Sequence, residues 1–169
     1  PDAGVTISEL KTLGVTDTVM LTGDRKATAE SITKAVKLDR CFSDLLPEDK
    51  VTALERIMAD KEARRKTAFV GDGINDALAL KEADVGIAMG IAGTEVSRNA
   101  ADIILTDDSF NTIVEAIKWG RGIYNNFQRY LQFTLTVNVI AFLLTIISQL
   151  LDHPLPFTTI HLLWVNIIM

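Results

Sequence analysis

A run of residues without any charge, 130–151, constrains the fold of this chain more than any other feature. As an α-helix, its roughly 22 residues rise about 33 Å, which matches the hydrocarbon core of a bilayer. The alternative, a helix buried in a soluble protein, is usually shorter. Lys118, Arg121 and Arg129 precede the run, and Asp152 and His153 follow it. Cationic residues mark the cytoplasmic side of a membrane helix, so we predict an integral membrane protein in contact with lipid, with residues 1–129 in the cytoplasm.

The remaining composition excludes one class of function and indicates a reducing compartment. The chain has 169 residues, a formal net charge of -5 and 48% hydrophobic residues. Nucleic-acid binding needs a clustered positive surface that contacts phosphates, so we expect no nucleic-acid partner. The single cysteine, Cys41, has no second thiol for an internal disulfide. It is expected to fill apolar space in a chain that folds under reducing conditions.

Before the charge-free run, short apolar segments alternate with amphipathic ones. Pro47 is typical of the first position of a helix, because Glu48 and Asp49 follow it in the first turn, where the helix dipole favours carboxylates. Alternation of strands and helices predicts a parallel sheet in an open α/β fold, in which ligands bind beyond the carboxyl ends of the strands. The expected strands are 18–23, 66–73, 83–90 and 100–108, and the expected helices between them include 28–36 and 74–81.

The pattern also predicts the order of domains along the chain. Pro154 and Pro156 cannot continue a helix, so the chain is expected to turn just after the charge-free run. The predicted segments are a partial α/β domain at 1–109, a stalk helix at 110–129, a transmembrane helix at 130–151, a non-cytoplasmic loop at 152–156 and the start of a second transmembrane helix at 157–169.

GDGINDA, at residues 71–77, is the strongest local signal for chemistry. Its two glycines allow a tight turn in which backbone N–H groups approach a ligand. Asp72 and Asp76 supply hard oxygen ligands of the kind that Mg²⁺ prefers, and Asn75 adds an amide that can donate to a phosphoryl oxygen. The alternative is an ordinary solvated turn, because Gly, Asp and Asn are common turn residues.

Two weaker signals accompany this motif. TGDR follows the first expected strand and offers the Thr22 hydroxyl and the Gly23 N–H. Lys50, in PEDK, lies at the start of an amphipathic helix, where a lone lysine is usually a surface charge. Because ligands bind beyond the strand ends, we predict that the turns at 22–24 and 71–73 and the loop near Gly90 lie together. A structure of this fold should also bring Thr22, Lys50, Asp72 and Asn75 together.

The motifs TGDR, PEDK and VGDGINDALAL, in this order, resemble the P-type cation-transporting ATPases, within the haloacid-dehalogenase-like superfamily. The resemblance runs over essentially the whole chain. It implies a haloacid-dehalogenase-like, Rossmann-type parallel sheet followed by membrane helices. It also implies an enzyme that couples cation transport to a covalent aspartyl-phosphate cycle, with ATP and Mg²⁺ as cofactors.

The same resemblance implies a role for the residues near the phosphate. Thr22 and Gly23 would contact the phosphoryl group, and Lys50 would offset its charge. Asp24, the last residue of TGD, would lie at the edge of the nucleotide site. Such groups would stabilise a metaphosphate-like transition state by position and electrostatics.

In the second motif the resemblance assigns Mg²⁺ binding to Asp72, with Asp76 as further support for the metal and Asn75 completing the pocket. The chain departs from the family in containing neither a DKTGT segment, which carries the nucleophilic aspartate, nor a TGE loop. These parts are expected in a missing N-terminal portion of the same protein. We therefore predict that this chain alone cannot hydrolyse ATP.

The choice of cation depends on the membrane segments. Residues 14–90 resemble the heavy-metal branch that exports zinc, cadmium or lead, and 92–169 resemble the plasma-membrane calcium branch, with a join near 89–92. Asn166 matches a calcium ligand of that branch, and Asn138 serves either ion binding or helix contacts. Amide oxygens suit Ca²⁺, and Ala141 replaces a glutamate of two-site calcium pumps. We predict Ca²⁺ transport with one ion per cycle; the alternative is heavy-metal export.

Two readings from other classes stay open. A soluble phosphatase of the same superfamily would need its own nucleophilic aspartate on a strand before TGDR, and no suitable segment occurs there. A non-catalytic, membrane-anchored regulator could be built from the same half-domain. The two differ from the pump in whether DKTGT and TGE segments precede this sequence.

Overall fold

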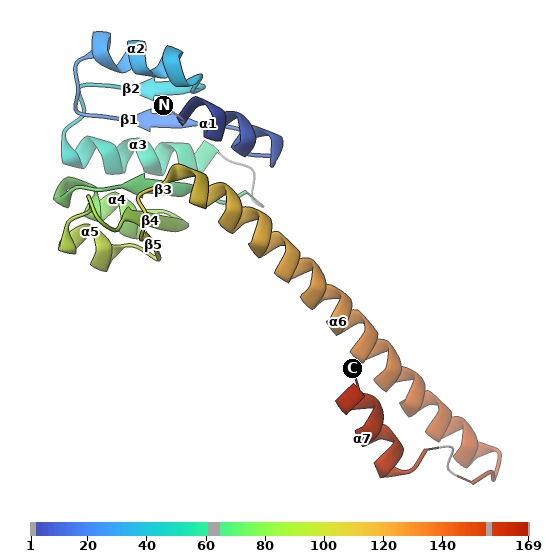
Figure 1. Cartoon of the computed structure of the whole chain (residues 1–169). Coiled ribbons are helices and arrows are strands. Elements are labelled where there is room, and N and C mark those ends of the chain that lie inside the picture. The colour runs from blue at the N-terminus through green and yellow to red at the C-terminus, as the bar shows by residue number, and fades with distance from the viewer. Residues whose placement is uncertain (1–2, 61–64, 155–156, 169) are drawn as a thin grey trace. The chain divides into compact units, whose positions relative to one another are not determined.

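The computed structural model describes residues 3–60, 65–154 and 157–168, without the side chains of residues 159, 162, 166 and 168. The chain divides into two compact units, Pro1–Ala116 and Ile117–Met169 (Figure 1).

The α/β unit begins with a small two-stranded sheet. Helix α1 (Ala3–Thr12) precedes strand β1 (Val19–Leu21), and helix α2 (Lys26–Val36) leads to strand β2 (Arg40–Phe42). The two strands are parallel, with Val19 opposite Arg40. A parallel pair needs a crossover connection, which α2 supplies.

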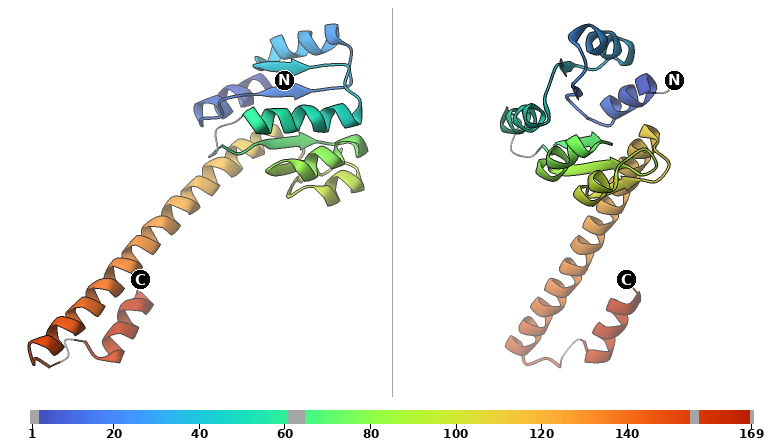
Figure 2. Two further views of the ribbon diagram at one scale, coloured as in Figure 1. Left: turned by 180° about the vertical axis from the view of Figure 1, so that it is seen from behind. Right: turned by 90° about the vertical axis from the view of Figure 1, so that its left-hand side faces the viewer.

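A second parallel sheet contains three strands in the order β3-β4-β5. This part of the chain is coloured green to yellow-green in the two further views of Figure 2. The strands are β3 (Ala68–Gly71), β4 (Val85–Met89) and β5 (Ile103–Leu105). The connecting and preceding helices are α3 (Pro47–Asp60), the 3-10 turn η1 (Ile74–Asp76), α4 (Ala77–Glu82) and α5 (Glu95–Ala100). The core lies where these helices meet the sheet, and its fully buried apolar residues include Leu54, Ala79, Leu80, Ala88 and Val114.

The parallel α/β fold that the sequence predicts is confirmed, but the strands form two sheets instead of one. Local periodicity carries no information about which strands pair, so it could not predict the division into two sheets. The expected helix at 74–81 is also divided, into η1 and α4. Helices α1 and α5 had not been predicted; α5 has only 6 residues, too few for a clear period.

An aspartate stands directly before three of the five described strands, and we call Asp39, Asp84 and Asp102 the strand-start aspartates. In each case a carboxylate oxygen accepts a backbone N–H near the start of the neighbouring strand, at 2.8 or 2.9 Å. The pairs are Thr18 with Asp39, Thr67 with Asp84 and Gly86 with Asp102. Charge-assisted bonds of this kind are strong, so they fix the relative start of each strand pair.

Acid is expected to weaken the first of these bonds. The Lys11 ammonium, 2.7 Å away, and the Thr18 hydroxyl and N–H lower the pKa of Asp39 from 3.8 to about 2. A depressed folded-state pKa stabilises the fold above the unfolded pKa, and this stabilisation is lost as the pH falls from about 4 to about 2. Asp39→Asn should therefore lower the thermal unfolding temperature at neutral pH, with a difference from wild type that shrinks toward about pH 2.

The matched control is Glu30→Gln. It removes a carboxylate whose ion pair with Lys26 is long, at 3.9 Å, and lies on an exposed helix face. Exposed pairs of this type contribute little to stability, so this variant should follow the wild-type curve. A difference between Asp39→Asn and wild type that stays constant with pH would contradict the assignment.

Helix α6 (Phe110–Leu150) has 41 residues and continues from the α/β unit through the charge-free run. Ile113 and Val114, in its first turns, are buried, and the first compact unit extends to Ala116. The predicted boundary between domain and stalk at 109 stays a prediction. By length and composition α6 is a candidate membrane span, with a mean hydropathy of 1.9 in its most apolar window. No break separates 110–129 from 130–150.

Helix α7 (Thr159–Ile168) is the last element of the second unit and has 10 residues. A membrane crossing needs about 20 residues, so the second transmembrane helix expected at 157–169 stays a prediction. Of the loop expected at 152–156, residues 155 and 156 lie outside the described part of the chain.

Candidate functional site

A buried ion pair joins two of the predicted site residues. Lys50 Nζ lies 2.7 Å from Asp76 Oδ1, and the two side chains are only 16% and 10% exposed. Helix α3 presents Lys50 from its first turn, and η1 presents Asp76. The lysine is therefore not the surface charge that its position in the sequence would usually indicate.

The turn after β3 holds Asp76 from the other side. The Gly73 N–H donates to Asp76 Oδ2 at 3.2 Å, so both carboxylate oxygens of Asp76 are engaged. A Cβ atom at Gly71 would lie 2.7 Å from the Cβ of Asp76, which no real side chain tolerates. Glycine at the end of β3 thus lets the Asp76 carboxylate fold back over the turn.

Asp72 lies in the same turn after β3 and is exposed. Its backbone carbonyl accepts the Thr94 N–H at 2.9 Å and lies 3.1 Å from Ser97 Oγ. The peptide group is thus held while the carboxylate stays accessible to solvent. Asn75, in η1, is also exposed.

The TGDR turn is tied to the start of α3. The Leu45 N–H donates to the Thr22 carbonyl at 3.1 Å, and the Asp24 N–H donates to Thr22 Oγ1 at 3.1 Å. Asp49, in the first turn of α3, accepts the N–H of Leu46, the residue just before the helix, at 3.1 Å. This bond caps the start of α3 next to Lys50. Thr22, Gly23 and Asp24 therefore lie beside the loop that leads into the Lys50 helix.

Among the predicted site residues, Lys50 and Asp76 are in direct contact. The TGDR turn is hydrogen-bonded to the loop that leads into α3. The convergence of Thr22, Asp72 and Asn75 on one bound phosphate stays a prediction. In the part of the chain that the structure describes, no hydrogen bond joins the side chains of these three residues.

The donors present are compatible with Mg²⁺ bound together with a phosphate. Within 3–60, 65–154 and 157–168 no group of three or more His, Cys, Asp or Glu side chains is arranged to hold a metal. Mg²⁺ is commonly bound through one or two carboxylates, waters and substrate phosphates and not by an all-protein cage. The exposed Asp72 carboxylate fits that mode, whereas Asp76 is already engaged by Lys50 and Gly73.

The membrane-segment candidates lie on different helices. Asn138 is exposed on α6, and Asn166 lies in α7, with a side chain outside the described part of the structure. Their role in ion binding stays a prediction.

Sequence reasoning missed the residues that contact the Asp72 carbonyl and the residue that binds the loop after β4. Thr94 caps α5 by accepting the Ser97 N–H, and Ser97 is fully buried. Asp108 accepts N–H groups of the loop after β4. A threonine three residues before serine at a helix start signals the cap, but nothing local signals the contact with Asp72.

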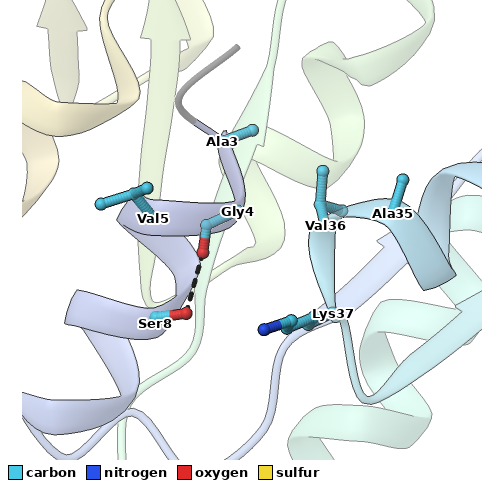
Figure 3. Close-up of a pocket in the computed structure, with 7 residues that line it drawn as sticks. All are labelled: Ala3, Gly4, Val5, Ser8, Ala35, Val36 and Lys37. Carbon is cyan, nitrogen blue, oxygen red and sulfur yellow. Dashed lines mark hydrogen bonds between the residues drawn. The ribbon is translucent and has the colours of Figure 1, made fainter.

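A hollow of about 550 Å³ lies apart from these residues, between α1 and the end of α2 (Figure 3). Gly4, Val5, Ser8 and Val36 contribute to its lining, and Ser8 donates to the Gly4 carbonyl at 2.9 Å. None of the predicted site residues lines it.

Comparison with known proteins gives the family to which the chain is similar. A family model described as haloacid dehalogenase-like hydrolase matches residues 1–84. The chain is 47% identical to plasma membrane-type calcium-transporting ATPase 7 of Oryza sativa subsp. japonica, over 77% of this chain and 12% of that protein. It is 37% identical to plasma membrane calcium-transporting ATPase mca-1 of Caenorhabditis elegans, over 100% of this chain and 16% of that protein.

Solved structures give the other half of the comparison. The crystal structure of a zinc-transporting PIB-type ATPase is 39% identical, with a TM-score of 0.76 over 86% of this chain and 23% of that chain. The catalytic domain of the CPx-ATPase CopB-B is 36% identical, with a TM-score of 0.62 over 70% of this chain and 45% of that chain. The chain thus spans only a minor part of each relative and shows likeness to both branches, as its sequence predicts. It is a haloacid-dehalogenase-like chain homologous to the P-type cation-transporting ATPases.

Proposed function

We propose that this chain is part of an ATP-driven pump that transports Ca²⁺ through an aspartyl-phosphate cycle. The observation that carries the proposal is the Lys50–Asp76 pair, buried beside the exposed Asp72 at the end of β3. A buried cation next to a free carboxylate is a suitable arrangement for a phosphoryl group and its metal. The homology to calcium-transporting ATPases supports the same conclusion.

In this proposal the site residues of the chain act through their position and their charge. Lys50 offsets the negative charge of the phosphoryl group, and Asp76 holds its ammonium in place at 2.7 Å. The Thr22 hydroxyl and the Gly23 N–H donate to phosphoryl oxygens, and Asn75 adds an amide donor. Asp24 lies at the edge of the ATP site.

Asp72 holds Mg²⁺, which when bound neutralises charge on the phosphoryl oxygens. The aspartate that accepts the phosphoryl group is expected from a part of the protein outside this sequence. Accordingly, the isolated chain should form no phosphoenzyme.

Ion choice is proposed from the membrane segments, which we place in lipid with residues 1–129 on the cytoplasmic side. Asn138 and Asn166 offer amide oxygens, which suit Ca²⁺ better than soft metals. The chain has no cysteine other than Cys41, which precedes α6. Heavy-metal transport is the second candidate, favoured by the 39% identity to a zinc-transporting ATPase of known structure.

Ca²⁺ is expected to stimulate ATP hydrolysis by the purified full-length protein, and Zn²⁺ is not. Asn138→Ala should raise the Ca²⁺ concentration for half-maximal activity, because it removes a ligand oxygen. Asn126→Ala, on the same helix before the charge-free run, is the control and should leave that concentration unchanged. Stimulation by Zn²⁺ alone would favour the second candidate.

A further inference from the structure

The peptide group between Asp72 and Gly73 is held from both of its sides. Its N–H, which belongs to Gly73, donates to Asp76 Oδ2 at 3.2 Å. Its carbonyl, which belongs to Asp72, accepts the Thr94 N–H at 2.9 Å and lies 3.1 Å from the buried Ser97 hydroxyl. A displacement of this stretch of backbone would carry the Asp72 side chain with it and would break the bond between the Gly73 N–H and Asp76.

The carbonyl side of this clamp depends on the loop 90–93, between β4 and α5. The Arg98 guanidinium donates to the carbonyls of Gly90 and Gly93, both at 2.8 Å. A Cβ atom at Gly93 would lie 1.8 Å from the Met89 carbonyl oxygen, so the loop folds tightly on itself. Because the Arg98 guanidinium binds carbonyls at both ends of the loop, the loop moves as one piece. Thr94, the next residue of the chain, moves with it.

A single carboxylate fixes this loop to the chain after β5. Asp108 Oδ1 accepts the N–H groups of Gly90 and Ile91 at 2.6 and 3.0 Å, and Oδ2 accepts the Ala92 N–H at 2.6 Å. The N–H donors of Ile91, and then those of Ala92 and Gly90, hold the pKa of Asp108 below its usual value. Three consecutive donors on one carboxylate form a defined cradle.

The neighbouring aspartate faces the other way. Asp107 accepts the Ser109 N–H at 3.1 Å and the Thr112 hydroxyl at 2.6 Å, so it caps the first turn of α6. The two adjacent carboxylates therefore bind different segments. Asp107 binds the start of α6, and Asp108 binds the loop 90–92. Neither touches the Asp72 carboxylate itself.

We propose that Asp108 is a positioning residue for Mg²⁺ binding by Asp72. It holds the loop 90–93, the loop holds Thr94 and Ser97, and these hold the Asp72 peptide. The inference rests on the proposed function, because it takes Asp72 as the Mg²⁺ carboxylate. A carboxylate whose backbone is free to rotate is a poorer ligand, since supporting groups around a metal ligand commonly contribute about 10-fold to 100-fold in affinity.

Asp108→Asn is the variant that tests this role. The φ of Asp108 is 51°, in the left-handed region that asparagine tolerates, so the backbone is preserved. The amide of asparagine would face at least one of the three loop N–H groups with a donor. The matched control is Asp102→Asn, at the opposite end of β5, which also removes a carboxylate that accepts a backbone N–H.

The measurement is phosphoenzyme formation from ATP by the full-length protein at increasing Mg²⁺. Asp108→Asn is expected to raise the half-saturating Mg²⁺ concentration about 10-fold, with the wild-type level recovered at saturating Mg²⁺. Asp102→Asn should leave that concentration unchanged, even where it lowers the amount of folded protein. A purely structural role of Asp108 would lower phosphoenzyme at every Mg²⁺ concentration alike, and this result would overturn the proposal.

Ser97→Ala decides the matter if Asp108→Asn does not accumulate. It removes the buried hydroxyl near the Asp72 carbonyl and should raise the half-saturating Mg²⁺ concentration by a smaller factor; an unchanged value would overturn the proposal. A wild-type protein that forms no Mg²⁺-dependent phosphoenzyme would overturn the proposed function as well. Normal wild-type phosphorylation with equal Mg²⁺ curves for Asp108→Asn and Asp102→Asn would overturn the positioning role alone.

Discussion

Lys50→Met is expected to abolish phosphoenzyme formation by the full-length protein and to destabilise its α/β unit by about 3 to 5 kcal/mol. The Lys50 ammonium lies 2.7 Å from Asp76, and both side chains are largely buried. Methionine keeps the apolar stem but leaves the Asp76 carboxylate without its counter-charge in a poorly solvated position, which is the costly way to break a buried pair. Thermal unfolding and ATP-dependent phosphorylation measure the two effects.

A second substitution separates stability from chemistry. Asp76→Asn added to Lys50→Met removes the unpaired buried charge, while its amide oxygen can still accept the Gly73 N–H. The double variant should regain much of the stability and remain without phosphoenzyme. Lys81→Met, an exposed lysine in the last turn of α4, is the control and should behave as wild type. Wild-type phosphorylation by Lys50→Met would remove Lys50 from the mechanism.

Asp72→Asn is expected to lower Mg²⁺-dependent phosphorylation about 100-fold or more, with no loss of stability. The Asp72 carboxylate is exposed, and the contacts that hold the residue are made by its backbone. The substitution therefore leaves the fold intact and removes the anionic oxygen that suits Mg²⁺. Phosphoenzyme measured at saturating ATP over a range of Mg²⁺ concentrations gives the size of the effect.

The control for Asp72→Asn is Glu82→Gln, which neutralises an exposed carboxylate at the end of α4. It should leave phosphorylation unchanged, because it lies outside the turns after β1 and β3. If both variants keep wild-type phosphorylation, Asp72 is not the metal ligand. Loss of folded protein in Asp72→Asn would contradict the view that its side chain has no structural role.

The elements that the sequence predicted well are those with a strong local cause. The absence of charge over 130–151 predicted the apolar part of α6, and Pro47 followed by two acidic residues predicted the start of α3. Strands β3 and β4 fall within apolar segments that end at glycine. In each of these cases the side chains of a single segment are sufficient to favour the structure.

The rest depends on contacts between segments that are distant in the sequence. Lys50 and Asp76 are 26 residues apart, and no local pattern distinguishes their pairing from two separate surface charges. The same holds for Asp108 and the loop 90–92, although the double aspartate is visible in the sequence. The structure shows that both carboxylate oxygens of Asp76 accept hydrogen bonds, from Lys50 and Gly73, while its predicted support of the metal stays a prediction.

The division of the strands into two sheets has a consequence for how this polypeptide behaves when isolated. In the orders β1-β2 and β3-β4-β5, the strands β1, β2, β3 and β5 each have a hydrogen-bonded neighbour on one side only, among the strands described. Open edges of this kind are templates for strand addition, either by another part of the same protein or by a second molecule. We therefore expect residues 1–169 expressed alone to associate through these edges, and we expect a complementary strand that fills them to suppress this association.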